Sequence, residues 1–304
     1  MIGRAGRGRL RVGPPAVAAL LVALGCAGML GPGGGERPAL VFLSDFGLSD
    51  DSVAICKGVM LEIEPRLRIV DLTHQVRPYS VEDGARFLAG TAPFYPAGTV
   101  FVAVVDPGVG GTRKAIVVLS GRGQYFVLPD NGLITLVADQ DGIRAAREIT
   151  NPGWMRTSPS ATFHGRDVFA PVGARLARGK DWTEVGPRLE NPVRISLPAA
   201  RADERGLSAE AIAVDGPYGN VVTNITADDF ETLRYRPGDT VLVRLGRREL
   251  RLPFVRTFSD VPAGQALLYI NSRGRLALAI NQGSFAQTYR VSVPAPVFVP
   301  RPGR

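Results

Sequence analysis

Cysteine and histidine are scarce in this sequence, which limits the metal and redox chemistry that it can support. Its 304 residues include two cysteines and two histidines. One cysteine, Cys26, lies in the N-terminal segment, so the sequence predicts neither a disulfide framework nor a cysteine metal site. The histidines, His74 and His164, lack the spacing of paired zinc ligands on a helix. We therefore expect no bound metal and no cofactor.

Several motifs of common enzyme folds are also missing. The chain has no phosphate-cradling glycine loop, no zinc-binding helix motif and no nucleophile elbow. Its formal net charge is +8, but Arg4, Arg7, Arg9 and Arg11 supply four of these charges. The rest carries about +4, without a basic run or a basic stripe interleaved with aromatic residues. Nucleic acid is therefore not an expected partner.

Long apolar runs are lacking too. The stretch from Ala16 to Leu24 is too short to span a bilayer. With the arginines before it and Gly25-Cys26 after it, residues 1–37 have the pattern of a targeting segment with a spacer, as in a bacterial lipoprotein acylated at Cys26. This predicts an exported protein, periplasmic or anchored to the membrane, and stable anchoring would need more than one acyl chain. The alternative is a cytoplasmic protein whose N-terminal extension results from an upstream start codon.

Residues 38–190 alternate short apolar strands with amphipathic helices. We expect strands at 39–43, 68–72 and 99–105, and helices at 52–63 and 81–91. This alternation predicts an α/β domain with a mainly parallel central sheet flanked by helices. Ligands of such sheets bind at the carboxyl ends of the strands, where we expect Asp45, Asp71 and Asp106.

The pattern changes after about residue 190. Residues 191–207 are rich in proline, arginine and alanine, which is typical of a linker. Residues 208–294 contain short apolar segments separated by turn signals, which predict a small β-barrel domain. The expected strands are 211–214, 221–225, 240–245, 266–270, 276–280 and 287–293. Residues 295–304 are expected to form a frayed tail.

Five polar segments stand out between the apolar ones. They are Ser44-Asp45-Phe46-Gly47-Leu48-Ser49-Asp50-Asp51, Asp71-Leu72-Thr73-His74, Asp106-Pro107-Gly108-Val109-Gly110 with Arg113, Pro129-Asp130-Asn131-Gly132, and Phe163-His164-Gly165-Arg166-Asp167. In this order they resemble the S-adenosylmethionine hydrolases, also called S-adenosylmethionine hydroxide adenosyltransferases, which are related to the fluorinase and the chlorinase. The resemblance runs from about residue 39 to 293. It implies an α/β domain followed by a β-barrel and a homotrimer whose ligand lies between neighbouring subunits.

The resemblance also implies a reaction and the residues that perform it. S-adenosylmethionine would be cleaved by water at the ribose C5′ atom to give adenosine and methionine. Asp106, Arg113 and His164 would act on the water, since an acid and an imidazole can polarise or deprotonate it and a guanidinium can stabilise hydroxide. A histidine judged by spacing alone is more often structural than catalytic, and His74 is expected to be structural. Asn131-Gly132 is expected to form a turn.

The remaining site residues are implied by the same resemblance. Asp45 would accept hydrogen bonds from the two ribose hydroxyls, although an acidic residue there could instead cap the next helix. The other expected ligand contacts are Asp50 to the ammonium group, Ser272 and Arg273 to the carboxylate, Asn220 to the adenine edge, Tyr218 and Phe258 to the adenine faces, and Asp215 as a further substrate-binding residue. Arg273 could instead be a solvated surface residue, and Phe258 could belong to the barrel core.

Two other functions compete with hydrolysis. In the fluorinase a tyrosine stands at the position of Asp106, and a Tyr-Ser pair stands at His164-Gly165. An anionic Asp106 would repel a halide, which disfavours an adenosyl halide synthase. Tyr79, Ile280 and Gln282 also depart from the halogenating relatives, which affects the purine contacts more than the reaction. The second alternative is a non-catalytic protein of the cell envelope that binds S-adenosylmethionine or a nucleoside.

Overall fold

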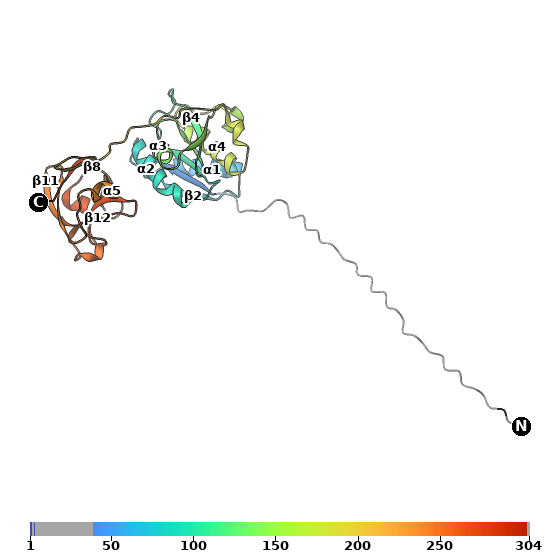
Figure 1. Cartoon of the computed structure of the whole chain (residues 1–304). Helices are drawn as coiled ribbons and strands as arrows, with labels where there is room; N and C mark the ends of the chain where they lie inside the picture. The colour runs from blue at the N-terminus through green and yellow to red at the C-terminus, as the bar shows by residue number, and fades with distance from the viewer. Residues whose placement is uncertain (2, 4–38, 303–304) are drawn as a thin grey trace. The chain divides into compact units, whose positions relative to one another are not determined.

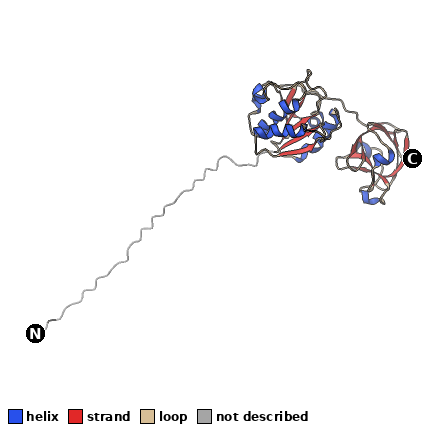
Figure 2. Ribbon diagram, turned by 180° about the vertical axis from the view of Figure 1, so that it is seen from behind, coloured by secondary structure: helices blue, strands red, loops and turns tan. Residues whose placement is uncertain are grey.

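The computed structural model describes residues 39–302 together with Met1 and Gly3. The predicted targeting segment and Cys26 therefore lie outside the described residues. The described chain folds into an α/β domain and, from Arg201 onward, a domain built mainly of strands (Figures 1 and 2). This is the predicted fold class.

The α/β domain is built on a six-stranded sheet in the order β2-β1-β3-β5-β4-β6. The strands β2, β1, β3 and β5 run parallel, and β4 is antiparallel to both β5 and β6. The strands are β1 (Leu40–Ser44), β2 (Ile69–Thr73), β3 (Val100–Val104), β4 (Ala115–Ser120), β5 (Tyr125–Pro129) and β6 (Ile143–Glu148). β1 and β3 are buried along their whole length, because apolar side chains leave both faces of these central strands.

Helices cover both faces of this sheet. On one face, α1 and α4 pack with alternate residues of β1 and β3, and on the other face α2 and α3 pack with the residues between them. The helices are α1 (Ser52–Ile63), α2 (Val81–Thr91), α3 (Thr135–Asp141) and α4 (Ala170–Ala177). Short helical turns lie at η1 (Ala92–Phe94), η2 (Pro152–Trp154), η4 (Trp182–Val185) and the π-helical η3 (Gly165–Phe169), which leads directly into α4.

The second domain is a nearly closed antiparallel sheet in the order β11-β10-β14-β8-β9-β13-β12, with β7 paired to β8. A bridge between Phe254 and Leu268 connects the two edges of this order. The strands are β7 (Arg201–Ala202), β8 (Gly206–Asp215), β9 (Asn220–Thr226), β10 (Thr240–Leu245), β11 (Arg248–Pro253), β12 (Ala266–Ile270), β13 (Arg275–Ile280) and β14 (Ala295–Pro300), with α5 (Ala227–Glu231), η5 (Phe258–Asp260) and α6 (Phe285–Tyr289) between them. Apolar residues of the strands and helices form a main core and a second, smaller cluster.

Three expectations about single segments were wrong. The stretch 287–293, expected as a strand, contains the end of α6, because Ser284 caps a helix by accepting a hydrogen bond from the Gln287 N–H. The expected tail at 295–304 contains β14, in which Val297 and Val299 alternate inward to the barrel core. Asp71 lies within β2 and not at its end.

The stretch 191–207, expected as a linker, is hydrogen-bonded to the α/β domain near its start and belongs to the barrel sheet at its end. The Val193 N–H donates to Asp130 Oδ1 at 2.7 Å, and the Ile195 N–H donates to Thr135 Oγ1 at 3.0 Å. Its last residues form β7 and the start of β8.

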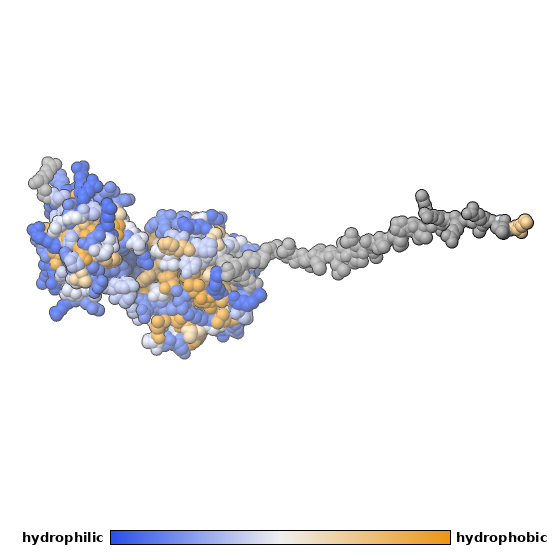
Figure 3. Space-filling view, turned by 90° about the horizontal axis from the view of Figure 1, so that it is seen from below, coloured by the Kyte–Doolittle hydropathy of each residue, from blue (hydrophilic) through white to orange (hydrophobic). Residues whose placement is uncertain are grey.

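Large apolar side chains are also exposed in both domains. On the face shown in Figure 3, apolar residues gather over the α/β domain. The most exposed large apolar side chains of the described domains are Leu48, Tyr79, Phe94 and Tyr218.

Candidate active site

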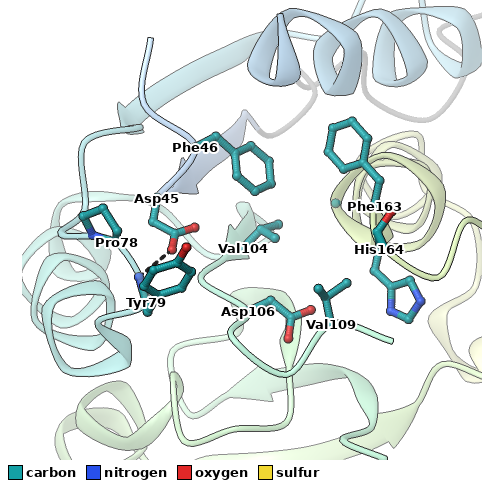
Figure 4. Close-up of a pocket in the computed structure, with 11 residues that line it drawn as sticks. Asp45, Phe46, Pro78, Tyr79, Val104, Asp106, Val109, Phe163 and His164 are labelled. Atoms are coloured by element: carbon teal, nitrogen blue, oxygen red, sulfur yellow. Dashed lines mark hydrogen bonds between the residues drawn. The ribbon is translucent and has the colours of Figure 1, made fainter. Parts of the chain in front are cut away.

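A pocket of about 350 Å³ opens at the carboxyl ends of β1 and β3. This is the edge at which parallel sheets bind ligands. Its lining residues are Asp45, Phe46, Pro78, Tyr79, Val104, Asp106, Val109, Thr162, Phe163, His164 and Gly165. Figure 4 shows Asp45 and Tyr79 on one side, His164 and Phe163 on the other, and Asp106 with Val109 between them. Most of these residues lie in loops next to the strands and helices of the α/β domain, whereas Val104 ends β3 and Gly165 begins η3.

Arg113 joins Asp106 and His164 into one cluster. Its Nε donates to Asp106 Oδ1 at 2.9 Å, and its Nη2 donates to Asp106 Oδ2. The same Nη2 lies 2.6 Å from His164 Nδ1. The side chains of Arg113 and Asp106 are 11% and 5% exposed, so this ion pair is shielded from most of the solvent. The structure thus brings together the three residues expected to act on water.

The contact with Arg113 decides which nitrogen of His164 carries a proton. A guanidinium has donors only, so His164 Nδ1 must accept, and the proton of the neutral ring is then on Nε2. Burial lowers the pKa of His164 below its ordinary value of 6.5, and the nearby Arg113 charge lowers it further. His164 is therefore neutral at pH 7, with an Nε2–H group that can donate to a ligand or a water but cannot accept a proton.

The loop before His164 is held by Asp167. This carboxylate accepts a hydrogen bond from the Ser160 N–H at 2.8 Å and two from the Arg166 guanidinium at 2.7 Å. Hydrogen bonding to Arg166 lowers the pKa of Asp167, which keeps it ionised as an acceptor. Asp167 itself lies in the π-helical turn that follows His164. The loop and the turn therefore fix the imidazole from both sides.

Asp45 follows β1 directly and lines the pocket. Its Oδ2 accepts a hydrogen bond from the Tyr79 N–H at 2.9 Å, which is the dashed line in Figure 4. Tyr79 adopts a left-handed backbone with φ of +65°, a conformation that few non-glycine residues adopt. The alternative that Asp45 caps the next helix is wrong, because Asp51 is the N-terminal cap residue of α1.

The other expected substrate-binding residues do not line this pocket in the described chain. Asp50 is exposed and accepts a hydrogen bond from the Ser52 N–H at 2.9 Å. The remaining ones lie in the barrel domain: Asp215 and Asn220 flank the β8–β9 turn with Tyr218 inside it, Ser272 and Arg273 lie in the β12–β13 turn, and Phe258 begins η5. Phe258 is partly exposed and packs on Tyr269 with ring centroids 4.9 Å apart, so it belongs only in part to the barrel core.

Sequence reasoning missed the apolar part of the pocket. The rings of Phe46 and Phe163 meet edge to face with centroids 5.8 Å apart. A Cβ atom added at Gly165 would lie 2.8 Å from Phe46 Cζ, so even a small side chain there would collide with this ring. Both phenylalanines adjoin the polar residues of the motifs, and this adjacency is the signal that could have identified them.

His74 is buried and hydrogen-bonded to two polar side chains, as expected of a structural histidine. Gly132 has the positive φ expected of the Asn131-Gly132 turn.

Among residues 39–302, no three His, Cys, Asp or Glu side chains lie close enough together to hold a metal ion. No helix within the same residues is long and apolar enough to cross a membrane.

Known sequence families and proteins match both domains of the chain. A family model described as "SAM hydroxide adenosyltransferase N-terminal domain" matches residues 40–186, and the corresponding "C-terminal domain" model matches residues 209–298. A protein of Salinispora arenicola named (R)-S-adenosyl-L-methionine hydrolase is 42% identical over 84% of this chain and 95% of its own length. A protein of the same name from Thermus thermophilus is 39% identical over 86% of this chain and 98% of its own length.

Two further matches define the relatives more broadly. A protein of Actinopolyspora mzabensis named fluorinase is 34% identical over 84% of this chain and 95% of its own length. A solved structure of an uncharacterized conserved protein from Thermotoga maritima superposes with a TM-score of 0.81 at 38% identity, and the match covers 86% of this chain and 99% of that one.

Proposed function

Because this chain belongs to the S-adenosylmethionine hydroxide adenosyltransferase family, we propose that it is a hydrolase that cleaves S-adenosyl-L-methionine with water into adenosine and L-methionine. The observation that carries this proposal is that Asp45, Asp106 and His164 line one pocket, and that Arg113 bonds to both Asp106 and His164. A binding protein would not need a shielded acid, guanidinium and imidazole on one side of its ligand.

The cluster can place a single water in line with the C5′ atom. The water oxygen forms a bond to C5′ while the C5′–sulfur bond breaks. The electron pair of the C5′–sulfur bond stays on the sulfur, which leaves as the neutral thioether of methionine. Asp106 accepts the proton that the water loses, through lone pairs that Arg113 does not occupy. The Nε2–H of His164 donates to the water oxygen, and the Arg113 charge stabilises its hydroxide character. A sulfonium is a good leaving group, so the main task is orientation.

Asp45 would hold the ribose of the substrate. One of its oxygens already accepts the Tyr79 N–H, and each carboxylate oxygen has two lone pairs, so both can still accept from the vicinal hydroxyls. This bidentate grip fixes the sugar ring and with it the direction of the C5′–sulfur bond.

The test is to incubate the purified protein with S-adenosylmethionine in oxygen-18 water and to analyse the products by chromatography and mass spectrometry. We expect equal amounts of adenosine and methionine, with the label on the 5′-hydroxyl of adenosine. Formation of 5′-chloroadenosine at high chloride would instead identify a halide synthase. Tight binding without any product would identify a non-catalytic binding protein. Either result would overturn the proposal.

Hydrolysis should remain constant down to a pH below 6.5. The reason is that Arg113 can donate to Nδ1 only while His164 is neutral, and burial lowers the pKa of this imidazole from 6.5. We expect log(kcat/KM) to fall as a single proton binds to His164 when the pH drops through that lowered pKa, because the protonated Nδ1 can no longer accept from Arg113. The midpoint of the His164 titration can be checked by NMR. The chain has two histidines, so the histidine signal that is lost in the variant His164→Gln belongs to His164. A midpoint above 6.5 would contradict the arrangement.

We further propose a homotrimer in which the barrel residues of one subunit complete the pocket of another. The exposure of two expected adenine contacts supports it, since Tyr218 and Phe258 are 70% and 38% exposed. Mixing the variants Asp45→Ala and Arg273→Ala, at a substrate concentration at which each alone has little activity, tests the shared site. A trimer with shared sites should regain part of its activity on mixing, whereas self-sufficient subunits would stay inactive.

Two smaller proposals concern what the chain carries and where it acts. The displacement needs no cofactor, so a strong chelator should leave turnover unchanged. The N-terminal pattern supports export with a lipid anchor at Cys26, and the variant Cys26→Ser should then move from the membrane fraction to the soluble fraction.

A further inference from the structure

A chain of hydrogen bonds lies beneath the pocket and is not used by the reaction. Ser44 Oγ lies 2.8 Å from His74 Nδ1, and His74 Nε2 lies 3.1 Å from Asp71 Oδ1. Lys57 Nζ donates to Asp71 Oδ2 at 2.6 Å. Ser44 is fully buried at the end of β1, and His74 is 4% exposed directly after the neighbouring strand β2. The chain of bonds therefore crosses from the surface of α1 to the central strand of the sheet.

The donors and acceptors of this chain can be ordered in one direction. The Asp71 carboxylate can only accept, so Nε2 of a neutral His74 donates to it and Nδ1 accepts the Ser44 hydroxyl proton. Burial raises the pKa of Asp71, but hydrogen bonds from Lys57 and His74 lower it to a net value below the ordinary one, which favours the ionised acceptor.

The three residues have the composition of a nucleophilic triad, but the serine is not accessible to a ligand. Ser44 has no exposed surface and is not among the residues that line the pocket. Its Oγ also accepts the Phe46 N–H at 3.4 Å. A buried hydroxyl in this position cannot attack a ligand, so the chain of bonds must act through the backbone around it.

That backbone carries Asp45. The segment 44–47 is tied to the segment 74–79 at three more points: the Gly47 N–H donates to the His74 carbonyl at 2.7 Å, the Val76 N–H donates to the Ser44 carbonyl at 3.4 Å, and the Tyr79 N–H donates to Asp45 Oδ2 at 2.9 Å. The ring of His74 also packs edge to face on Phe42, with centroids 4.7 Å apart. The position of the His74 ring therefore affects both the loop of Asp45 and the donor that orients its carboxylate.

We propose that Ser44, His74 and Asp71 form a positioning relay that fixes the Asp45 carboxylate for the ribose hydroxyls. This inference rests on the proposed function, because it takes the ligand of Asp45 to be the sugar of S-adenosylmethionine. The relay residues do not touch the substrate, so they should affect its binding more than the chemical step.

A matched pair of variants separates the two bonds of His74. In His74→Asn, the amide oxygen takes the place of Nδ1 and can still accept from Ser44. In His74→Gln, the amide nitrogen takes the place of Nε2, so the bond to Asp71 is kept and the bond to Ser44 is lost. We expect His74→Gln and Ser44→Ala to raise KM about 5- to 10-fold with kcat within about twofold, as for one lost hydrogen bond, and His74→Asn to stay close to the parent protein. A role in filling space would give the opposite order, since glutamine is closer to histidine in volume.

The double variant Ser44→Ala/Asp45→Ala tests whether the relay acts through Asp45. We expect no further rise of KM beyond that of Asp45→Ala, because residues of one network are not additive. The variant Thr135→Ala is the control, since it removes another buried hydroxyl of the same domain, bonded to Gly132 and Ile195, and should leave KM unchanged. Melting curves of all variants identify any that fail to fold, and His74→Asn then remains as the conservative comparison.

The outcomes distinguish the relay from the proposed function. If the parent protein hydrolyses S-adenosylmethionine and both Ser44→Ala and His74→Gln keep its KM, the relay alone is wrong. Additive effects in the double variant would also overturn it. If the parent protein neither binds adenosine in calorimetry nor forms it from S-adenosylmethionine, the proposed function fails first, and the relay loses its ligand with it.

Discussion

Replacing Asp106 by asparagine is expected to lower kcat about 10³-fold while the affinity for S-adenosylmethionine changes little. The amide cannot take the proton of the attacking water. It also turns an NH₂ group toward Arg113, which donates from both Nε and Nη2 at this place. The guanidinium then loses its shielded counterion and would be drawn toward His164. Single-turnover formation of adenosine, followed by chromatography, measures the chemical step, and calorimetry with the intact substrate measures binding.

The control for this variant is Asp139→Asn. Asp139 is also paired with an arginine, Arg194, but it is exposed and away from the pocket. Its loss should leave kcat unchanged. If Asp106→Asn kept kcat within threefold of the parent protein, Asp106 would have no part in activating the water.

The second large effect is expected at Asp45. Asp45→Ala should raise KM about 100-fold, because it removes a charged acceptor for two hydroxyls, and hydrogen bonds to charged groups contribute about 1.5–3 kcal/mol each. The measurement is calorimetry with adenosine and 2′-deoxyadenosine. The parent protein should bind adenosine at least about 10-fold more tightly, and the variant should bind both nucleosides alike.

The comparison of the two nucleosides is an internal control. A general loss of structure would weaken the binding of both nucleosides and leave the ratio of their affinities as it is in the parent protein. Equal binding of both nucleosides by the parent protein would show that Asp45 does not contact the ribose.

Part of the α/β domain could be predicted, because the local signals of β1, β2, β3, α1 and α2 agree. The strands β4, β5 and β6 and the helices α3 and α4 were not among the expected elements. Both helices expected from apolar spacing, at 52–63 and 81–91, have these bounds, and Ser80 caps the second. In the barrel, the expected strands at 211–214, 221–225, 240–245, 266–270 and 276–280 fall within β8, β9, β10, β12 and β13. β11 was not expected because Arg248, Glu249 and Arg251 interrupt its apolar pattern at the edge of the sheet, and β14 was not expected because prolines surround its two inward valines.

The site was predictable in composition but not in geometry. Asp106 and Arg113 lie in one motif, but only the fold brings His164, which is 51 residues beyond Arg113, to the same guanidinium. No local pattern indicates that Arg113 donates to Nδ1, yet this contact assigns the proton of the imidazole to Nε2. The contact between Gly165 and the Phe46 ring is likewise a property of the folded chain.

The π-helical turn after His164 has a consequence for how this site could vary among related chains. A π-turn contains one residue more per turn than the α-helix that it interrupts. Deleting a single residue from 165–169 would let α4 extend backward in regular α form and rotate the imidazole about 100° around the helix axis, away from Arg113. Substitutions within this turn can tune the site, but its length must stay constant for the histidine to face the guanidinium.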